Sequence, residues 1–313
     1  MKLAVALLVL ATPIAFAQSP APQYKLPDWQ IAAGTHAEFD VASIRPVPPD
    51  APPHDGYDLL NNPLLNPYAE DAPPKGLLTA SASTVNYIIF AYKIFDVSQM
   101  RTLSAQLPAW ARTDAYIINA RADGSPTRDQ IRLMMQSLLA DRFHLALHTE
   151  TRQLAVNALV LEKPSTPGPQ LQPHPANVPC SVAADDPPAT KSPANATPAP
   201  ICGLSHWRVN GLMHLRMLNV TMPQIASLLS GAGILLGEMS QRPLIDQTGL
   251  TGRFDLNLEF LPERNGPSSS SDSDVAGPTV IAALKSQLGL KLVKQSAPID
   301  TLVVDHIEKP SAN

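Results

Sequence analysis

The chain has 313 residues and a formal net charge of −4. This length suggests about two domains, and the mild acidity argues against a nucleic-acid binder, because such proteins carry a clustered basic surface. Apolar residues make up 44% of the chain, enough for a packed core, whereas the 33 prolines, about twice the usual share, indicate that parts of the chain are irregular.

The N-terminal residues have the three parts of a secretory signal peptide. Lys2 supplies the positive charge, an apolar segment follows, and Ala15-Phe16-Ala17 is a small-residue cleavage motif. We therefore assign residues 1–17 to the signal peptide and expect cleavage between Ala17 and Gln18. The apolar segment is shorter than the roughly 20 residues of a membrane span, and no later segment is apolar enough to span. The mature protein is expected in a periplasm or outside the cell, with no transmembrane segment.

Residues 18–75 are predicted to hold one strand and a Pro-rich segment. The strand covers residues 39–44 and ends at Pro46, because proline lacks the N–H that a sheet ladder needs. Three stretches have a composition typical of linkers, being rich in proline and small polar residues: 46–76, 164–204 and 262–278.

Two segments outside these stretches have similar sequences, and we interpret them as a tandem duplication with diverged copies. The first copy covers residues 76–164 and the second 211–313. In each copy a hydroxyl residue precedes an apolar helical stripe, at Ser83 and at Thr221, and both copies contain Glu-Lys-Pro near their ends.

Each copy is predicted to have the order β-α-β-α-β-β, which is the α+β class. Hydroxyl and glutamine residues three apart, Thr127 with Gln130 and Thr221 with Gln224, predict capping boxes at two helix starts. In the first copy we expect the first helix at 83–93, the middle strand at 115–122, the second helix at 128–142 and a hairpin of strands 143–150 and 154–162. In the second copy the corresponding ranges are 221–231, 253–260 and 278–288, followed by a hairpin of strands 290–295 and 299–307.

Residues 165–210 join the copies and are predicted to be a Pro-rich loop held by a disulfide. Cys180 and Cys202 are the only cysteines, and an exported protein with two cysteines is expected to join them. In the loop-entropy model such a bond stabilises the fold by about 3 kcal/mol. Two free thiols are the alternative. The chain lacks nearby histidine ligands and a C-x-x-C motif, which disfavours a zinc site or a redox role.

Signatures of catalysis are absent: the chain has no G-x-S-x-G, H-E-x-x-H or P-loop motif. We therefore expect no cofactor and no metal, and a non-catalytic protein is favoured over an enzyme. His144 and His148 are placed on a strand, where residues four apart lie about 13 Å apart, too far for one metal ion. Trp110 and Trp207 are expected to be partly buried anchors.

A hydrolase would need two carboxylates that converge in a cleft. Three carboxylates surround the second central strand: Asp246, Asp255 and Glu259. Asp246 lies between proline and glycine in a segment typical of a turn, so a structural role is favoured for it.

Several motifs resemble those of a large family of secreted proteins of unknown function found in soil-dwelling acidobacteria. The motifs lie in order along nearly the whole mature chain: FDVASIRP at 39–46, LPAW at 107–110, LLADRFHL at 138–145, HTETR at 148–152, DQTGLTGRFD at 246–255, QLGLKL at 287–292 and VDHIEKP at 304–310. The resemblance implies no catalytic residue, but it does imply an extracytoplasmic sensing or interaction role. Residues 220–254 also resemble the small α/β domains that precede secretins and outer-membrane transporters, which bind proteins.

The sequence thus predicts an exported, two-repeat α+β protein that binds an envelope or extracellular protein and no nucleic acid. Exposed edge strands are the expected contact surface, because they offer unpaired backbone groups. Two alternatives stay open. One is an extracytoplasmic small-ligand sensor with an enclosed apolar pocket, and the other is a hydrolase with a carboxylate site between the repeats.

Overall fold

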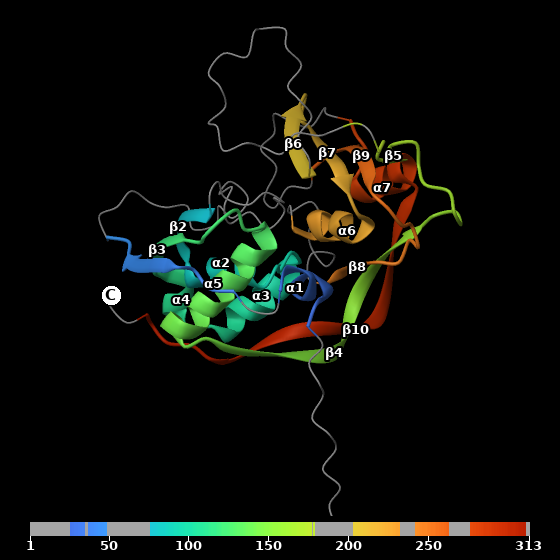
Figure 1. The fold of residues 1–313 in the computed structure, drawn as a ribbon. Coiled ribbons are helices and arrows are strands. Elements are labelled where there is room, and N and C mark those ends of the chain that lie inside the picture. Colours follow the sequence, from blue (N-terminus) through green and yellow to red (C-terminus); the bar gives the residue numbers. More distant parts are fainter. Residues whose placement is uncertain are drawn as a thin grey trace, which may run out of the picture.

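A computed structural model describes residues 26–34, 37–48, 76–176, 178, 203–231, 242–262 and 276–310. In these ranges the chain combines helices with three small sheets (Figure 1), which confirms the predicted α+β class. The signal-peptide cleavage site and both cysteines lie outside these ranges, so both assignments stay predictions. The tandem duplication also stays a prediction.

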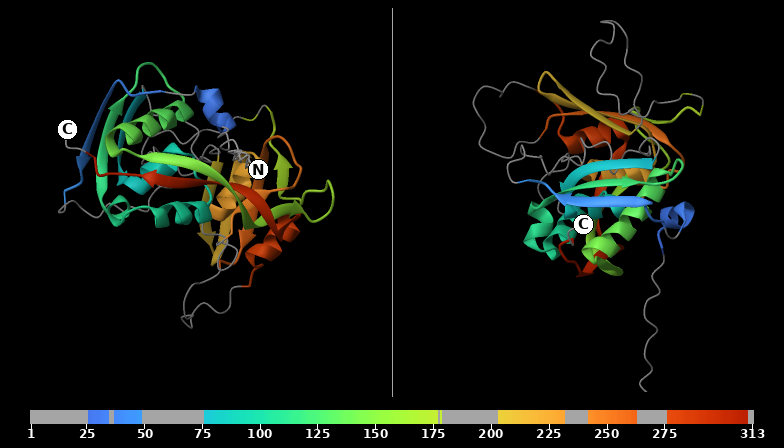
Figure 2. Two further views of the ribbon diagram at one scale, coloured as in Figure 1. Left: turned by 90° about the horizontal axis from the view of Figure 1, so that it is seen from below. Right: turned by 60° about the vertical axis from the view of Figure 1, so that its left-hand side comes forward.

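The first half of the molecule is a three-stranded antiparallel sheet covered by helices. The strand order is β1-β3-β2, and the right-hand view of Figure 2 shows the three strands side by side. The elements are α1 (Asp28–Ala33), β1 (Val41–Pro46), β2 (Leu77–Ser83), α2 (Thr84–Ala91), α3 (Val97–Gln106), α4 (Ala109–Thr113), β3 (Ala115–Arg121) and α5 (Arg128–Phe143).

The second half is built on a four-stranded antiparallel sheet of order β5-β9-β7-β6. Apolar side chains of α6 and α7 pack against one face of this sheet and form the second core. Strands β5 and β6 lie within residues 165–210. The elements are β5 (Leu171–Pro173), β6 (Gly203–Val209), β7 (Leu212–Val220), α6 (Met222–Gly231), β8 (Leu244–Asp246), β9 (Phe254–Phe260) and α7 (Val280–Leu288).

Both predicted capping boxes form. The Thr127 side chain accepts from the backbone N–H of Gln130, and the Gln130 side chain accepts from that of Thr127. Thr221 and Gln224 exchange the same two hydrogen bonds at the start of α6. Local sequence therefore determines where these helices begin.

The two predicted hairpins are wrong, because each is one continuous strand. Strand β4 (Ala146–Leu161) and strand β10 (Leu290–His306) pair with each other antiparallel along almost their whole length. Residues at or beside the expected turns are paired across the ladder, Arg152 with Ile299 and Gln153 with Pro298. Figure 2 shows the two strands running together from one half of the molecule to the other. We call this pair the ribbon.

Each ribbon strand contributes to both cores. Near one end of the ribbon Leu147, Leu302 and Val304 pack against the first core. At the other end Leu159 and Leu290 are buried in the second core. Between these ends the residues of β4 from Thr151 to Gln153 are exposed, and this stretch marks the passage between the two cores.

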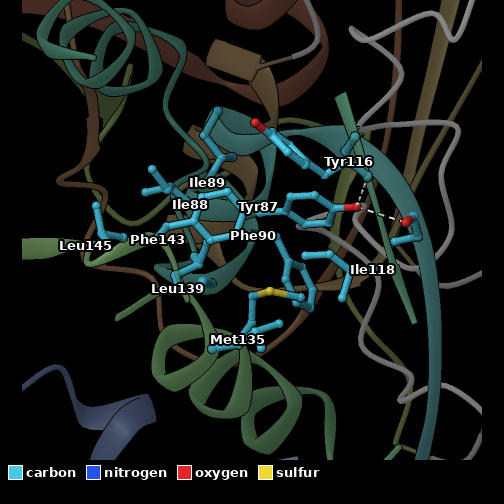
Figure 3. Close-up of a cluster of buried hydrophobic side chains, with 14 of the residues drawn as sticks. Tyr87, Ile88, Ile89, Phe90, Tyr116, Ile118, Met135, Leu139, Phe143 and Leu145 are labelled. Carbon is cyan, nitrogen blue, oxygen red and sulfur yellow. Dashed lines mark hydrogen bonds between the residues drawn. The ribbon is translucent and has the colours of Figure 1, made fainter. Parts of the chain in front are cut away.

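Tyr87 on the buried helix α2 lies at the centre of the first core (Figure 3). Its hydroxyl lies 2.8 Å from the carbonyl oxygens of both Ala80 on β2 and Tyr116 on β3. Burial raises the pKa of Tyr87, because the phenolate would lose its hydration. The neutral hydroxyl thus ties the helix to two strands.

Replacing Tyr87 with Phe should lower the free energy of unfolding by about 1–2 kcal/mol, because the hydrogen bond to the two buried carbonyl groups is lost. Urea denaturation of the mature protein measures this change. Tyr116→Phe is the matched control, since it removes a hydroxyl from the same cluster that is not part of this bridge. Equal losses for both variants would contradict the role given to the Tyr87 hydroxyl.

Asp96 joins the two halves through a buried carboxylate. One oxygen caps α3, accepting from the backbone N–H groups of Ser98 and Gln99 and from the Ser98 hydroxyl. The other accepts from the Ser230 hydroxyl on α6 at 2.8 Å and from the backbone N–H of Leu244 on β8 at 3.2 Å. A buried carboxylate is stable only when its oxygens are satisfied in this way.

Asp96→Ala should therefore reduce the free energy of unfolding by about 2–3 kcal/mol, because donors in both halves lose a charged acceptor. Thr279→Ala is the matched control: it removes a cap that accepts one exposed hydrogen bond, from Ala282, and should cost about 1 kcal/mol. If Asp96→Ala lowers the free energy of unfolding by no more than the control does, the hydrogen bonds of Asp96 to the second half contribute nothing to stability.

Candidate binding face

The three carboxylates that the hydrolase alternative needs have separate partners. Asp246 accepts from the backbone N–H and the hydroxyl of Thr248, which is the predicted turn. Asp255 accepts from His174 and from the backbone N–H of Asn219. Glu259 faces His214, with 3.4 Å between Glu259 Oε2 and His214 Nδ1. Since Asp255 and Glu259 are four residues apart on β9, their Cα atoms lie about 13 Å apart.

His144 and His148 also lie apart in structure. His144 adopts a left-handed conformation, with φ 48° and ψ 36°, and ends α5 before the strand starts, so its predicted place on a strand is wrong. His148 lies on β4, where Nδ1 is 2.8 Å from Asp305 and Nε2 is 3.1 Å from Glu150. In the part of the chain that the structure describes, no three His, Cys, Asp or Glu side chains are grouped to hold a metal ion.

The hydrogen bond to Asp305, followed by that to Glu150, raises the pKa of His148 above that of a free histidine. The ion pair is thus fully formed below the pKa of a free histidine as long as the carboxylates stay ionised, and it is lost as the pH rises through the raised pKa. Asp305→Asn should lower the pKa of His148, measured by NMR titration of its ring protons. Asp300→Asn, five residues away on the same strand, is the control and should leave that pKa unchanged. No difference between the two variants would contradict the assignment.

Glutamine side chains cap short stretches of two strands, the edge strand β10 and the part of β9 beyond its pairing with β5. Gln106 from α3 accepts from the backbone N–H of Val304 on β10 and donates to the carbonyl of Leu302. Gln287 from α7 accepts from the N–H of Glu259 on β9 and donates to its carbonyl. Each amide takes the place of a neighbouring strand, which is a protection against unwanted strand pairing.

Strand β6 has no such protection in the described ranges. It pairs with β7 on one side, through a two-residue turn at Asn210-Gly211 in which both residues have positive φ. This is the preferred turn of a tight hairpin, and the Asn-Gly pair is a sequence signal for it that our prediction missed. The last four residues of β6 are exposed, among them Trp207 at 44% and Val209 at 46%. Trp207 is therefore not the partly buried anchor that was expected, whereas Trp110 is partly buried as predicted.

The open side of β6 follows from the geometry of its hairpin. Val209 and Leu212 flank the two-residue turn, and such a pair exchanges both of its hydrogen bonds across the hairpin. Bonding to β7 then alternates along the strand. The backbone N–H groups of Leu204, His206 and Arg208 consequently point away from β7, where a further strand would bind.

A groove of about 320 Å³ lies on the outer face of the same sheet. Trp207 and His214 form part of its wall, with ring planes 6° from parallel and ring centroids 5.6 Å apart. The other lining residues are Gln170, Leu215, Asn257, Leu258, Glu259 and Gln287. The groove is thus mixed in character, with an aromatic wall, three amides and one carboxylate, and it is not the enclosed apolar pocket that the sensor alternative required.

No helix among the described residues is both long enough and apolar enough to cross a membrane.

Comparison with known proteins identifies a family. The family model described as a protein of unknown function (DUF3738) matches residues 85–307, and the chain therefore belongs to this family. The match runs from α2 to just beyond β10, so it includes β6, the second core and most of the first core, whereas β1 and β2 precede it. No curated protein and no solved structure matches the chain. The narrower likenesses to soil-associated proteins and to secretin-type domains stay predictions.

Proposed function

We propose that this member of the DUF3738 family is an exported, non-catalytic interaction module that binds an envelope or extracellular protein by strand addition at β6. The observation that supports this proposal is the open edge of β6. Strand addition uses backbone hydrogen bonds for affinity and alternate side chains for specificity, and β6 offers both.

The other open edges are poorer candidates. Strand β1 ends at Pro46, which has no N–H to donate, and the edge strands β5 and β8 have only three residues each. Strand β2 lies before the range that the family model matches. Gln287 and Gln106 cap short stretches of β9 and β10, whereas no described side chain caps β6 in this way.

The chemistry of β6 suggests the kind of partner. Exposed Trp207 and Val209 lie on one face of the strand, with Arg208 between them on the other face. A partner strand with apolar side chains at alternate positions would pack beside Trp207 and Val209, as cross-strand neighbours do.

The test is to remove one outward backbone donor without removing the side chains of the edge. His206→Pro lacks the outward N–H, whereas the matched control His206→Ala keeps it. The mature protein and both variants are used as bait in envelope extract from the native host, with crosslinking and mass spectrometry. The proposal predicts a partner that binds the wild type and His206→Ala and is lost with His206→Pro. Unchanged circular dichroism of His206→Pro shows that loss of binding is not loss of the fold.

Amide exchange then tests the mode of binding. When the captured partner is added, the amide protons of Leu204 and Arg208 should exchange more slowly, because they become hydrogen-bonded. Equal capture by His206→Pro and His206→Ala, or unchanged exchange at these amides, would rule out strand addition at β6.

A further inference from the structure

We infer that the groove beside Trp207 is a carbohydrate site that binds the neutral ring of a mono- or disaccharide. This site is on the outer face of the sheet, whereas the proposed protein contact uses the edge of β6. The inference therefore does not rest on the proposed function.

The aromatic wall suits the apolar face of a sugar ring. Trp207 and His214 are cross-strand neighbours on β6 and β7, and their nearly parallel rings stack on each other at the wall of the groove. Trp207 is 44% exposed although it lines a groove on the protein, so a large apolar surface meets water there. A flat ligand that packs its C–H face on this wall would bury that surface.

The opposite side of the groove offers hydrogen bonds of both kinds. Asn257 and Glu259 lie on one face of β9, because they are two residues apart on a strand. The amide of Asn257 can both donate and accept, and the carboxylate of Glu259 accepts. The hydroxyl groups of a sugar also donate and accept, and they lie around the rim of its ring, so an aromatic wall and polar side chains match its two surfaces.

Glu259 is held in place for such a contact. Its backbone N–H and carbonyl are both bound by the Gln287 amide, and its side chain faces His214. This positioning lowers the entropy that is lost when the carboxylate binds a ligand. The same glutamine that closes the edge of β9 therefore also fixes a wall of the groove.

Charge and size narrow the ligand class. None of the lining residues is Lys or Arg, and one is Glu, which disfavours phosphates and other anions. Glu259 already has a neighbour in the imidazole of His214, with 3.4 Å between His214 Nδ1 and Glu259 Oε2. The volume of about 320 Å³ lies at the lower end of the range for small-ligand sites, roughly 300–1,000 Å³. This size suits one or two rings.

The test uses the mature protein with four defined probes. Cellobiose and diacetylchitobiose are the neutral disaccharides, choline is a small cation, and AMP is an anion with an aromatic ring. Calorimetry measures affinity, and the Trp207 indole N–H signal in an NMR spectrum reports contact with the groove. The inference predicts saturable binding of at least one disaccharide with a shift of that signal, and no binding of AMP.

Variants distinguish the groove from the edge. Trp207→Ala should weaken disaccharide binding by about tenfold or more, a loss typical of the removal of one stacking ring. Glu259→Gln should weaken it less, since an amide still accepts hydrogen bonds. Val209→Ala, on the same strand outside the groove, is the matched control and should bind normally. His206→Pro should also bind the sugar normally, so failure of the proposed protein contact and failure of this site are separate results.

Three results would overturn the inference. The first is that neither disaccharide binds up to millimolar concentration. The second is that choline or AMP binds more tightly than the sugars. The third is that Trp207→Ala leaves sugar binding unchanged.

Discussion

The ribbon of β4 and β10 is the constraint on which the rest of the structure depends. Each strand begins beside one core and ends in the other, so neither half has a complete core without the strand that arrives from the other half. Withdrawing the arriving strand from each half would remove Leu302 and Val304 of β10 from the first core and Leu159 of β4 from the second. Exposure of these apolar side chains costs several kcal/mol. Asp96 adds a buried polar contact between the same halves.

This arrangement explains why the binding features gather on one sheet. The first sheet is short and lies against its helices, and the ribbon connects it to the second half. In the second half α6 and α7 cover one face of the four-stranded sheet, and the other face bears the groove. Helix α7 contributes to both the core and the groove. Its apolar side packs in the core, whereas Gln287 caps the open part of β9 and positions the backbone of Glu259. The open edge of β6 and the groove are thus held by a rigid support, as a binding surface requires.

Local signals in the sequence predicted several helices and the middle strands β3 and β9, whereas the ribbon and β6 were missed. The helix starts at Thr127 and Thr221 were predictable because a capping box depends on four consecutive residues. The ribbon was missed because polar residues near Arg152 resemble a turn, and only the pairing with β10 shows that the strand continues. Strand β6 was missed within a Pro-rich stretch, although Asn210-Gly211 signals its hairpin. The glutamine caps could not be predicted, since they depend on where α3 and α7 pack.

Native-state hydrogen exchange along β4 tests most directly that the ribbon makes the two halves one cooperative unit. The comparison is between the slowest amides of residues 146–150, beside the first core, and those of residues 156–160, beside the second. If the ribbon joins the cores, both groups exchange with the same opening free energy, equal to that of global unfolding. Two different free energies, with one group opening while the other stays protected, would show that the halves unfold independently and would contradict this account.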